Sequence, residues 1–122
     1  MIHNETMVKV ADNTGAKTAK VIRILKGSNA KTATVGDMVV VSIKSASPGG
    51  VVAKGDVVWG VVVRTRKEIP RKDGTYIRFE DNAIALIEKN RAPKGKRIFG
   101  PVAREVREKG FSQLASMAED II

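Results

Sequence analysis

The first two thirds of the sequence consists of short apolar or alternating runs separated by turn residues. These runs occupy residues 7–11, 18–25, 38–43, 57–63, 76–79 and 83–87. No helix-length segment lies between them, so the pattern favours an antiparallel sheet over a parallel sheet with crossover helices. A barrel leaves no free strand edges in a chain of this length. We therefore expect a mainly β fold, a small closed five-stranded antiparallel barrel.

Two similar turn sequences each lead into a valine-rich run. They are Val-Gly-Asp at residues 35–37 and Lys-Gly-Asp at residues 54–56. Glycine allows a positive φ, and an aspartate side chain accepts a hydrogen bond from nearby backbone in a turn. We therefore interpret Asp37 and Asp56 as residues of barrel corners and not as catalytic carboxylates.

The periodicity becomes helical near the C-terminal end of the sequence. Pro101 suits the first position of a helix, and Gly110 is a stop signal. Ser112 is a candidate cap for a second helix. The pattern predicts one or two short helices within residues 101–118, followed by a tail at residues 119–122 that packs or frays.

Composition limits the class of protein. The 122 residues fit a single domain, residues 1–122. Lys and Arg number 22 and Asp and Glu 13, and the net charge of +9 predicts a polyanionic partner. The chain has no cysteine, which excludes disulfides, thiolate metal sites and a cysteine nucleophile. The first residues lack a basic head and an apolar run, and no apolar stretch is long enough to cross a membrane, so we expect no secretion signal and no membrane partner.

No motif for catalysis, a cofactor or a metal is complete. The segment 22–32 has alanine where a phosphate-binding loop needs glycine before its Lys-Thr pair, and no helical pattern follows. His3 is the single histidine, and nothing in its pattern would orient it as a general base. Glu80 and Asp81 offer too few oxygens for a hard cation and are typical of a solvated turn. We expect no enzyme activity, no cofactor and no metal.

Positive charge is concentrated between residues 64 and 97, where eleven cations minus five acidic residues leave +6. The first part of this window joins a valine-rich run to an aromatic one through an Asp-Gly turn. The pattern predicts a basic β-ribbon at about residues 64–79 that projects from the barrel; a solubilising hairpin is the alternative. Arginine forks and lysine charges on such a ribbon can bind RNA phosphates. The candidate RNA-binding residues are Arg64, Arg66, Lys67, Arg71, Lys72, Arg78, Lys94 and Lys96.

The aromatic residues are few and dispersed. They are Trp59, Tyr76, Phe79, Phe99 and Phe111. Proteins that bind single strands use clustered aromatic side chains as stacking platforms. We therefore expect these five residues to lie in the core or at its rim, and the partner to be folded RNA recognised through its shape and phosphates.

Several strings along the sequence occur in an order that is specific to one known family. They are Val-Ala-Asp-Asn-Thr-Gly-Ala at 10–16, Pro-Gly at 48–49, Gly-Val-Val-Val-Arg-Thr at 60–65, the segment from Asp-Gly at 73–74 to Asn82, and Arg-Ile-Phe-Gly-Pro-Val-Ala-Arg-Glu at 97–105. Together they cover essentially the whole chain and resemble the family of bacterial large-subunit ribosomal protein L-fourteen. The chain departs from the family pattern in having Ala85 for valine and Trp59-Gly60 for Lys-Ala.

The resemblance implies a barrel with a projecting ribbon and short C-terminal helices, bound to large-subunit rRNA on the cytoplasmic ribosome. It also implies contact with small-subunit rRNA, for which Lys44, Ser47 and Arg97 are the intersubunit-bridge candidates. The implied protein partners are ribosomal proteins L-nineteen and L-three. A ribosome-silencing factor is a further implied partner, at the face of Arg97 and the C-terminal helices, where Gln113 replaces the family's frequent lysine.

Two other classes stay open as alternatives. A free-standing nucleic-acid-binding barrel, such as an RNA chaperone, would carry exposed aromatic side chains clustered on one sheet face. An enzyme acting on RNA would need convergent carboxylates or a paired histidine, and the sequence shows neither. The structural rRNA-binding protein is the interpretation that charge, strand pattern and resemblance share.

Overall fold

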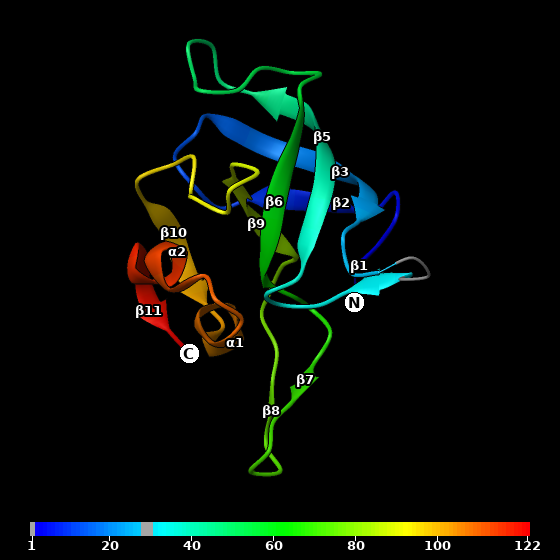
Figure 1. Cartoon of the computed structure of the whole chain (residues 1–122), viewed down its shortest axis with the longest axis vertical. Helices are drawn as coiled ribbons and strands as arrows, with labels where there is room; N and C mark the ends of the chain where they lie inside the picture. Colours follow the sequence, from blue (N-terminus) through cyan, green and yellow to red (C-terminus); the bar gives the residue numbers. More distant parts are fainter. Residues whose placement is uncertain (1, 28–30) are drawn as a thin grey trace.

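A closed barrel forms the body of the protein. The computed structural model describes residues 2–27 and 31–122. Among these, five strands close the barrel (Figure 1): β2 (Met7–Val10), β3 (Ala16–Ile24), β5 (Met38–Ala46), β6 (Val57–Arg64) and β9 (Ala83–Ile87). The predicted five-stranded barrel is confirmed.

One strand pair in the barrel differs from the expected antiparallel pattern. Successive strands pair antiparallel, but β2 and β9 pair in parallel, with Lys9 opposite Ala83 and Val10 opposite Ile84. The reason is geometric, because the first and last of an odd number of alternating strands run in the same direction. Closure of this barrel therefore requires one parallel seam.

Burial follows the alternation of the sequence in some strands and departs from it in others. In β5 the valines Val39 and Val41 are buried and their neighbours are partly exposed. In contrast, every residue of β9 is buried. The outer side of this part of the barrel is covered by the C-terminal segment, whose Val102, Ala103 and Leu114 belong to the same apolar core cluster.

The C-terminal segment contains four elements that pack against the barrel (Figure 1). They are β10 (Ile98–Val102), α1 (Arg104–Glu108), α2 (Ser112–Ser116) and β11 (Ala118–Ile121). The prediction of one or two short helices is confirmed, with two present, and the tail forms β11, which pairs in parallel with β10. This segment is tied to the barrel by backbone hydrogen bonds from Phe99 N to Ala11 O (2.7 Å) and from Ala103 N to Val63 O (3.1 Å).

Two details of the expected helices were wrong. Pro101 lies in β10, and the first helix begins later, at Arg104, because the preceding residues are drawn into the pairing of β10 with β11. Ser112 is the first residue of α2 and not its cap; the cap position is Phe111, without a side-chain hydrogen bond. The stop at Gly110 is confirmed, since a φ of +100° just beyond the α1 cap suits glycine.

The remaining strands form two small ladders outside the barrel. β1 (Ile2–His3) pairs with β4 (Thr32–Ala33), and β7 (Ile69–Pro70) pairs with β8 (Tyr76–Ile77). The β7–β8 ribbon, with its turn, projects from one end of the barrel (Figure 1). The ribbon is thus present in the predicted stretch, but its ladder is shorter than residues 64–79. Of the rejected phosphate loop at 22–32, residues 28–30 lie outside the described part of the chain.

The turn roles predicted for two aspartates are confirmed. Asp37 Oδ2 accepts a hydrogen bond from Thr34 N (2.9 Å), and Asp56 Oδ2 accepts one from Ala53 N (2.9 Å). Asp37 also receives two ammonium groups, from Lys26 (3.1 Å) and from Lys109 (3.2 Å) at the end of α1. The Asp37 corner therefore attaches the first C-terminal helix to the barrel.

The surroundings of Asp37 determine the pKa of its carboxyl group. Burial raises this pKa, but the hydrogen bond from Thr34 N and the ammonium groups of Lys26 and Lys109 outweigh burial, and the pKa is lowered from 3.8. A carboxyl group with a lowered folded-state pKa stabilises the fold above its unfolded pKa, and this stabilisation is lost as the pH falls through the folded pKa.

We predict that Asp37→Asn lowers the melting temperature at pH 7, because asparagine keeps the turn hydrogen bond and removes the charge that holds Lys26 and Lys109. The difference in melting temperature between wild type and Asp37→Asn should be smaller at pH 3, which is below the ordinary aspartate pKa of 3.8. Asp56→Asn is the matched control at the other corner and should leave the melting temperature unchanged at both pH values. A gap that is equally wide at both pH values would contradict the charge-based explanation.

Candidate nucleic-acid interface

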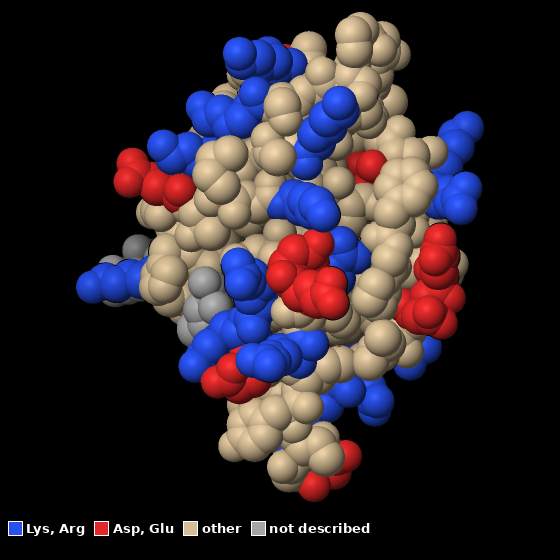
Figure 2. Space-filling view, turned by 180° about the vertical axis from the view of Figure 1, so that it is seen from behind, with Lys and Arg blue, Asp and Glu red and all other residues tan. Residues whose placement is uncertain are grey.

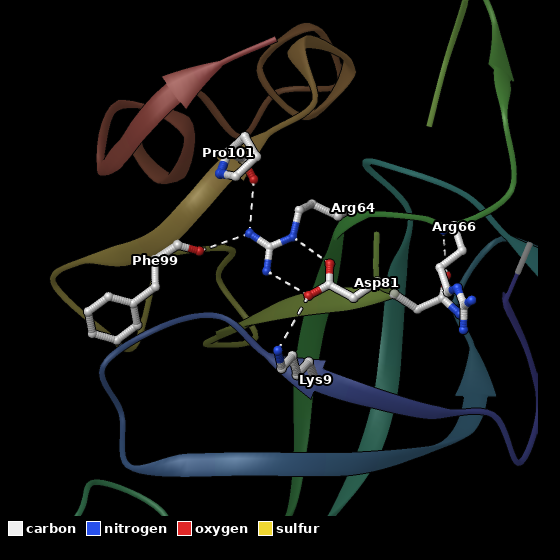
Figure 3. A network of polar contacts seen from close by, with 7 residues as sticks. Lys9, Arg64, Arg66, Asp81, Phe99 and Pro101 are labelled. Atoms are coloured by element: carbon white, nitrogen blue, oxygen red, sulfur yellow. Dashed lines mark hydrogen bonds and ion pairs between the residues drawn. The ribbon is translucent and has the colours of Figure 1, made fainter. Parts of the chain in front are cut away.

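The guanidinium of Arg64, at the end of β6, is turned into the protein (Figure 3). Its side chain is 9% exposed. Nε donates to Asp81 Oδ1 (2.8 Å) and Nη2 donates to Asp81 Oδ2 (3.3 Å), while Nη1 donates to the carbonyls of Phe99 (2.8 Å) and Pro101 (3.1 Å). Because these bonds occupy the guanidinium within its own chain, Arg64 fastens β10 to the barrel and presents no free fork to a phosphate.

The strand β10 is shaped to accept this guanidinium. Gly100 has a φ of +84°, and a Cβ placed on it would lie 2.6 Å from Arg64 Nη1. Any other residue would therefore displace the guanidinium as well as strain the backbone. On the far side of the network, Lys9 Nζ lies 3.8 Å from Asp81 Oδ2 (Figure 3), so Asp81 is a charged anchor and not the solvated turn residue that was expected.

Arg71, at the base of the ribbon turn, is also held within the protein. Nε and Nη2 donate to the two carboxylate oxygens of Glu105 in α1 (3.2 and 3.1 Å), and Nη2 donates to Ile122 O (2.6 Å). Only 13% of its side chain is exposed. Arg71 therefore attaches the ribbon to the C-terminal segment.

Five of the other six candidates are exposed, and the sixth, Lys94, is half-buried. Lys67 pairs with Glu68 (2.9 Å), but both side chains are exposed, and such pairs contribute little energy. Lys94 is half-buried and pairs with Glu88 (3.1 Å). Of the eight candidates, four are exposed and form no ion pair with the described residues: Arg66, Lys72, Arg78 and Lys96.

The free cations of the ribbon lie beside a firmly attached base. Arg66 N donates to Asn82 Oδ1 (2.9 Å), which attaches the ribbon base to the segment before β9, and Phe79 N donates to Thr65 O (2.9 Å), which joins the two sides of the base. The side chains of Arg66 and Arg78 line an open hollow there. Figure 2 shows Lys and Arg side chains spread over this view of the molecule, with several clustered just above the projecting end and acidic groups between them.

Two of the three bridge candidates, Ser47 and Arg97, are hydrogen-bonded to the same segment, residues 12–17. Ser47 N donates to Gly15 O (2.7 Å), and Arg97 O accepts a hydrogen bond from Asn13 N (3.2 Å). Lys44 is exposed at the end of the strand that leads to Ser47. The side chain of Arg97 is 64% exposed; Nη2 lies 3.7 Å from Glu119 Oε1, and Cζ lies 5.5 Å from the centre of the Phe99 ring.

The expectation that all aromatic residues lie in or beside the core was wrong for two of them. Phe111 is buried, and Trp59 and Phe79 pack partly buried against the core. Tyr76 and Phe99, however, are exposed. The alternation of side chains along a strand could have indicated this, because it puts Tyr76 on the opposite face of the ribbon from Ile77, which packs on the core.

The described residues show no centre for metal chemistry. Within them, no group of three or more His, Asp or Glu side chains is placed to hold a metal ion. The helices that the structure describes are too short and too polar to cross a membrane. The most prominent chemical feature of the described surface is therefore its distribution of cations.

The fold and its surface define a small basic barrel protein with a projecting ribbon. Comparison with family models makes this specific: residues 1–122 match the family described as Ribosomal protein L14p/L23e. The chain belongs to this family, whose members are structural proteins of the large ribosomal subunit and generally not enzymes. The resemblance found in the sequence is confirmed.

We predict that Arg64→Ala lowers the free energy of unfolding by about 3 kcal/mol, because it leaves two carbonyls and the Asp81 carboxylate without their charged donor. The free energy of unfolding of Arg64→Lys should lie between those of Arg64→Ala and wild type, since lysine keeps the charge but lacks the planar fork of donors. Equilibrium denaturation with urea measures both. Arg66→Ala, two residues away and exposed, is the matched control and should change the unfolding energy by less than about 0.5 kcal/mol. Equal effects at 64 and 66 would contradict the anchoring role.

Proposed function

We propose that this protein binds large-subunit rRNA through the exposed cations of the ribbon and the adjacent loops. The observation that carries the proposal is the division of the candidate cations into two groups. Arg64 and Arg71 are occupied by their own chain, whereas Arg66, Lys72, Arg78 and Lys96 are exposed without an ion pair in the described structure. The free group is available to phosphates, and Lys67 and Lys94 can join it by exchanging weak partners.

The mechanism of binding is neutralisation of phosphates by a fixed array of charges. Each contact releases condensed counterions from the RNA, which supplies affinity without reading the sequence of bases. The ribbon is attached to α1 through Arg71 and to the barrel through Asn82, so its cations are positioned before RNA arrives. Little conformational entropy is then lost on binding.

We further propose that the segment around residues 12–17 faces the small subunit. Lys44 and Arg97 supply positive charge there for small-subunit rRNA, and Ser47 supplies a hydroxyl group. The location that follows is the cytoplasmic ribosome. Ribosomal proteins L-nineteen and L-three are the proposed protein neighbours, and a silencing factor is a proposed partner of the face that holds Arg97 and α2, where Gln113 is exposed.

A free-standing barrel for single strands is less well supported. That function needs several aromatic side chains on one face. In the described structure the two exposed aromatic residues, Tyr76 in β8 and Phe99 in β10, lie on different elements. An RNA-cleaving enzyme has no supporting observation.

We predict that affinity for large-subunit rRNA falls with salt concentration, with a log–log slope of about −4 to −5 if the six available candidates each meet a phosphate. Filter binding over a potassium chloride series measures the slope. Lys72→Ala should reduce its magnitude by about one. Lys54→Ala removes the same charge from an exposed loop outside the ribbon and should leave the slope unchanged. A flat salt response of the wild type would refute phosphate-mediated binding.

We predict that Arg97→Glu leaves large subunits assembled but impairs their joining to small subunits, because it reverses an exposed charge of the proposed bridge. Sucrose-gradient sedimentation of subunits at a fixed magnesium concentration separates the two effects. Glu119→Gln is the control, since it removes the neighbouring carboxylate of Arg97 and keeps the cation; joining should be normal or better. Normal joining by the Arg97→Glu subunits would remove this residue from the bridge.

A further inference from the structure

Tyr76 is the most exposed large apolar side chain of the described structure, at 70%. It lies in β8, directly opposite Pro70 of β7. Directly opposed residues of an antiparallel pair project from the same face. Tyr76 and the exposed Pro70 therefore form a small apolar platform on one face of the ribbon.

The opposite face of the same ribbon is already used by the protein. Ile69 and Ile77, the neighbouring pair in the ladder, pack on the apolar core. Arg71, in the same phase as Ile69, is bound to Glu105. Packing therefore accounts for Ile69 and Ile77, whereas nothing within the described chain accounts for leaving an aromatic ring in water at Tyr76.

The charges around the platform indicate what covers it. Lys72 and Arg78 each lie two residues from a platform residue, Pro70 and Tyr76, and both are exposed without an ion pair in the described ranges. An apolar protein surface that covered the platform would desolvate both cations and offer them no opposite charge in return. A nucleotide supplies an aromatic base for the ring and phosphates for the two cations.

The nearby carboxylates do not change this picture. Glu68 is paired with Lys67 (2.9 Å). Asp73 Oδ1, in the turn, accepts hydrogen bonds from Thr75 N (3.1 Å) and from Thr75 Oγ1 (2.6 Å). These two carboxylates have partners of their own. Glu80 lines a hollow with Arg78, and Glu108 lines one with Lys72, but neither carboxylate forms an ion pair with these cations in the described residues. Lys72 and Arg78 therefore remain available to an external anion.

We propose that Tyr76 stacks on an unpaired nucleobase of the bound RNA, with Pro70 extending the platform and Lys72 and Arg78 holding the flanking phosphates. This inference rests on the proposed rRNA-binding function and adds to it a contact made through a base. Stacking accepts any base, so it fixes the position of the ribbon on an unpaired nucleotide without selecting a sequence.

The test uses the full chain and in vitro transcribed large-subunit rRNA from the same organism. Tyr76→Leu keeps an apolar side chain and removes the ring, and we expect its affinity to fall by about 5- to 100-fold, with an unchanged salt slope. Tyr76→Phe keeps the ring and should bind within about twofold of wild type. Met7→Leu changes an exposed apolar residue outside the ribbon and should have no effect.

Ultraviolet cross-linking of assembled large subunits gives an independent readout. We expect a nucleotide adduct on the peptide that carries Tyr76. An adduct that joins this peptide to another protein would overturn the inference and assign the platform to a protein neighbour. Wild-type affinity in Tyr76→Leu, with the salt dependence intact, would overturn the stacking contact alone. If the wild type itself binds rRNA without salt dependence, the proposed function fails together with this inference.

Discussion

The arrangement of the molecule depends on the single guanidinium of Arg64. It joins three parts of the chain that are distant in sequence: the end of β6, Asp81 before β9, and the carbonyls of β10. A fork bound to a carboxylate and two carbonyls is a strong and directional set of charge-assisted hydrogen bonds. Because β10 leads into both helices, this network helps to position the C-terminal segment, together with the backbone bonds of Phe99 and Ala103 and the pair of Lys109 with Asp37. The backbone of Arg97, just before β10, is held by hydrogen bonds with Asn13.

The ribbon shows how strand alternation divides one basic sequence between two tasks. Ile69 faces the body of the protein, and the guanidinium of Arg71, two residues further on, donates its hydrogen bonds to Glu105 and to the carbonyl of Ile122. Pro70 is exposed, and Lys72 in the turn that follows is exposed and carries a free charge. Net charge therefore overstates the number of cations that a polyanion can meet. The distinction between internal and external cations determines the electrostatic part of the proposed RNA binding.

Local sequence signals predicted the barrel, the aspartate turns, the ribbon and the stop at Gly110, because each depends on neighbouring residues. The roles of Arg64 and Arg71 could not be predicted in this way. Their carboxylate partners lie 17 and 34 residues away in the sequence, and the pairing of Arg71 with Glu105 exists only after the C-terminal segment has docked. For the same reason Pro101 is in a strand, since its pairing partner β11 lies at the far end of the chain. The exposure of Tyr76 could have been predicted from the alternation of side chains along its strand.

We expect this scaffold to be fully formed before it meets RNA. Amide hydrogen exchange of the free protein, compared with the protein in the large subunit, tests it directly at Phe99 N and Ala103 N, which bond across to the barrel. We predict slow exchange at both amides in the free protein, with little further protection in the subunit. Fast exchange at these amides in the free protein, with protection gained only on the ribosome, would contradict it.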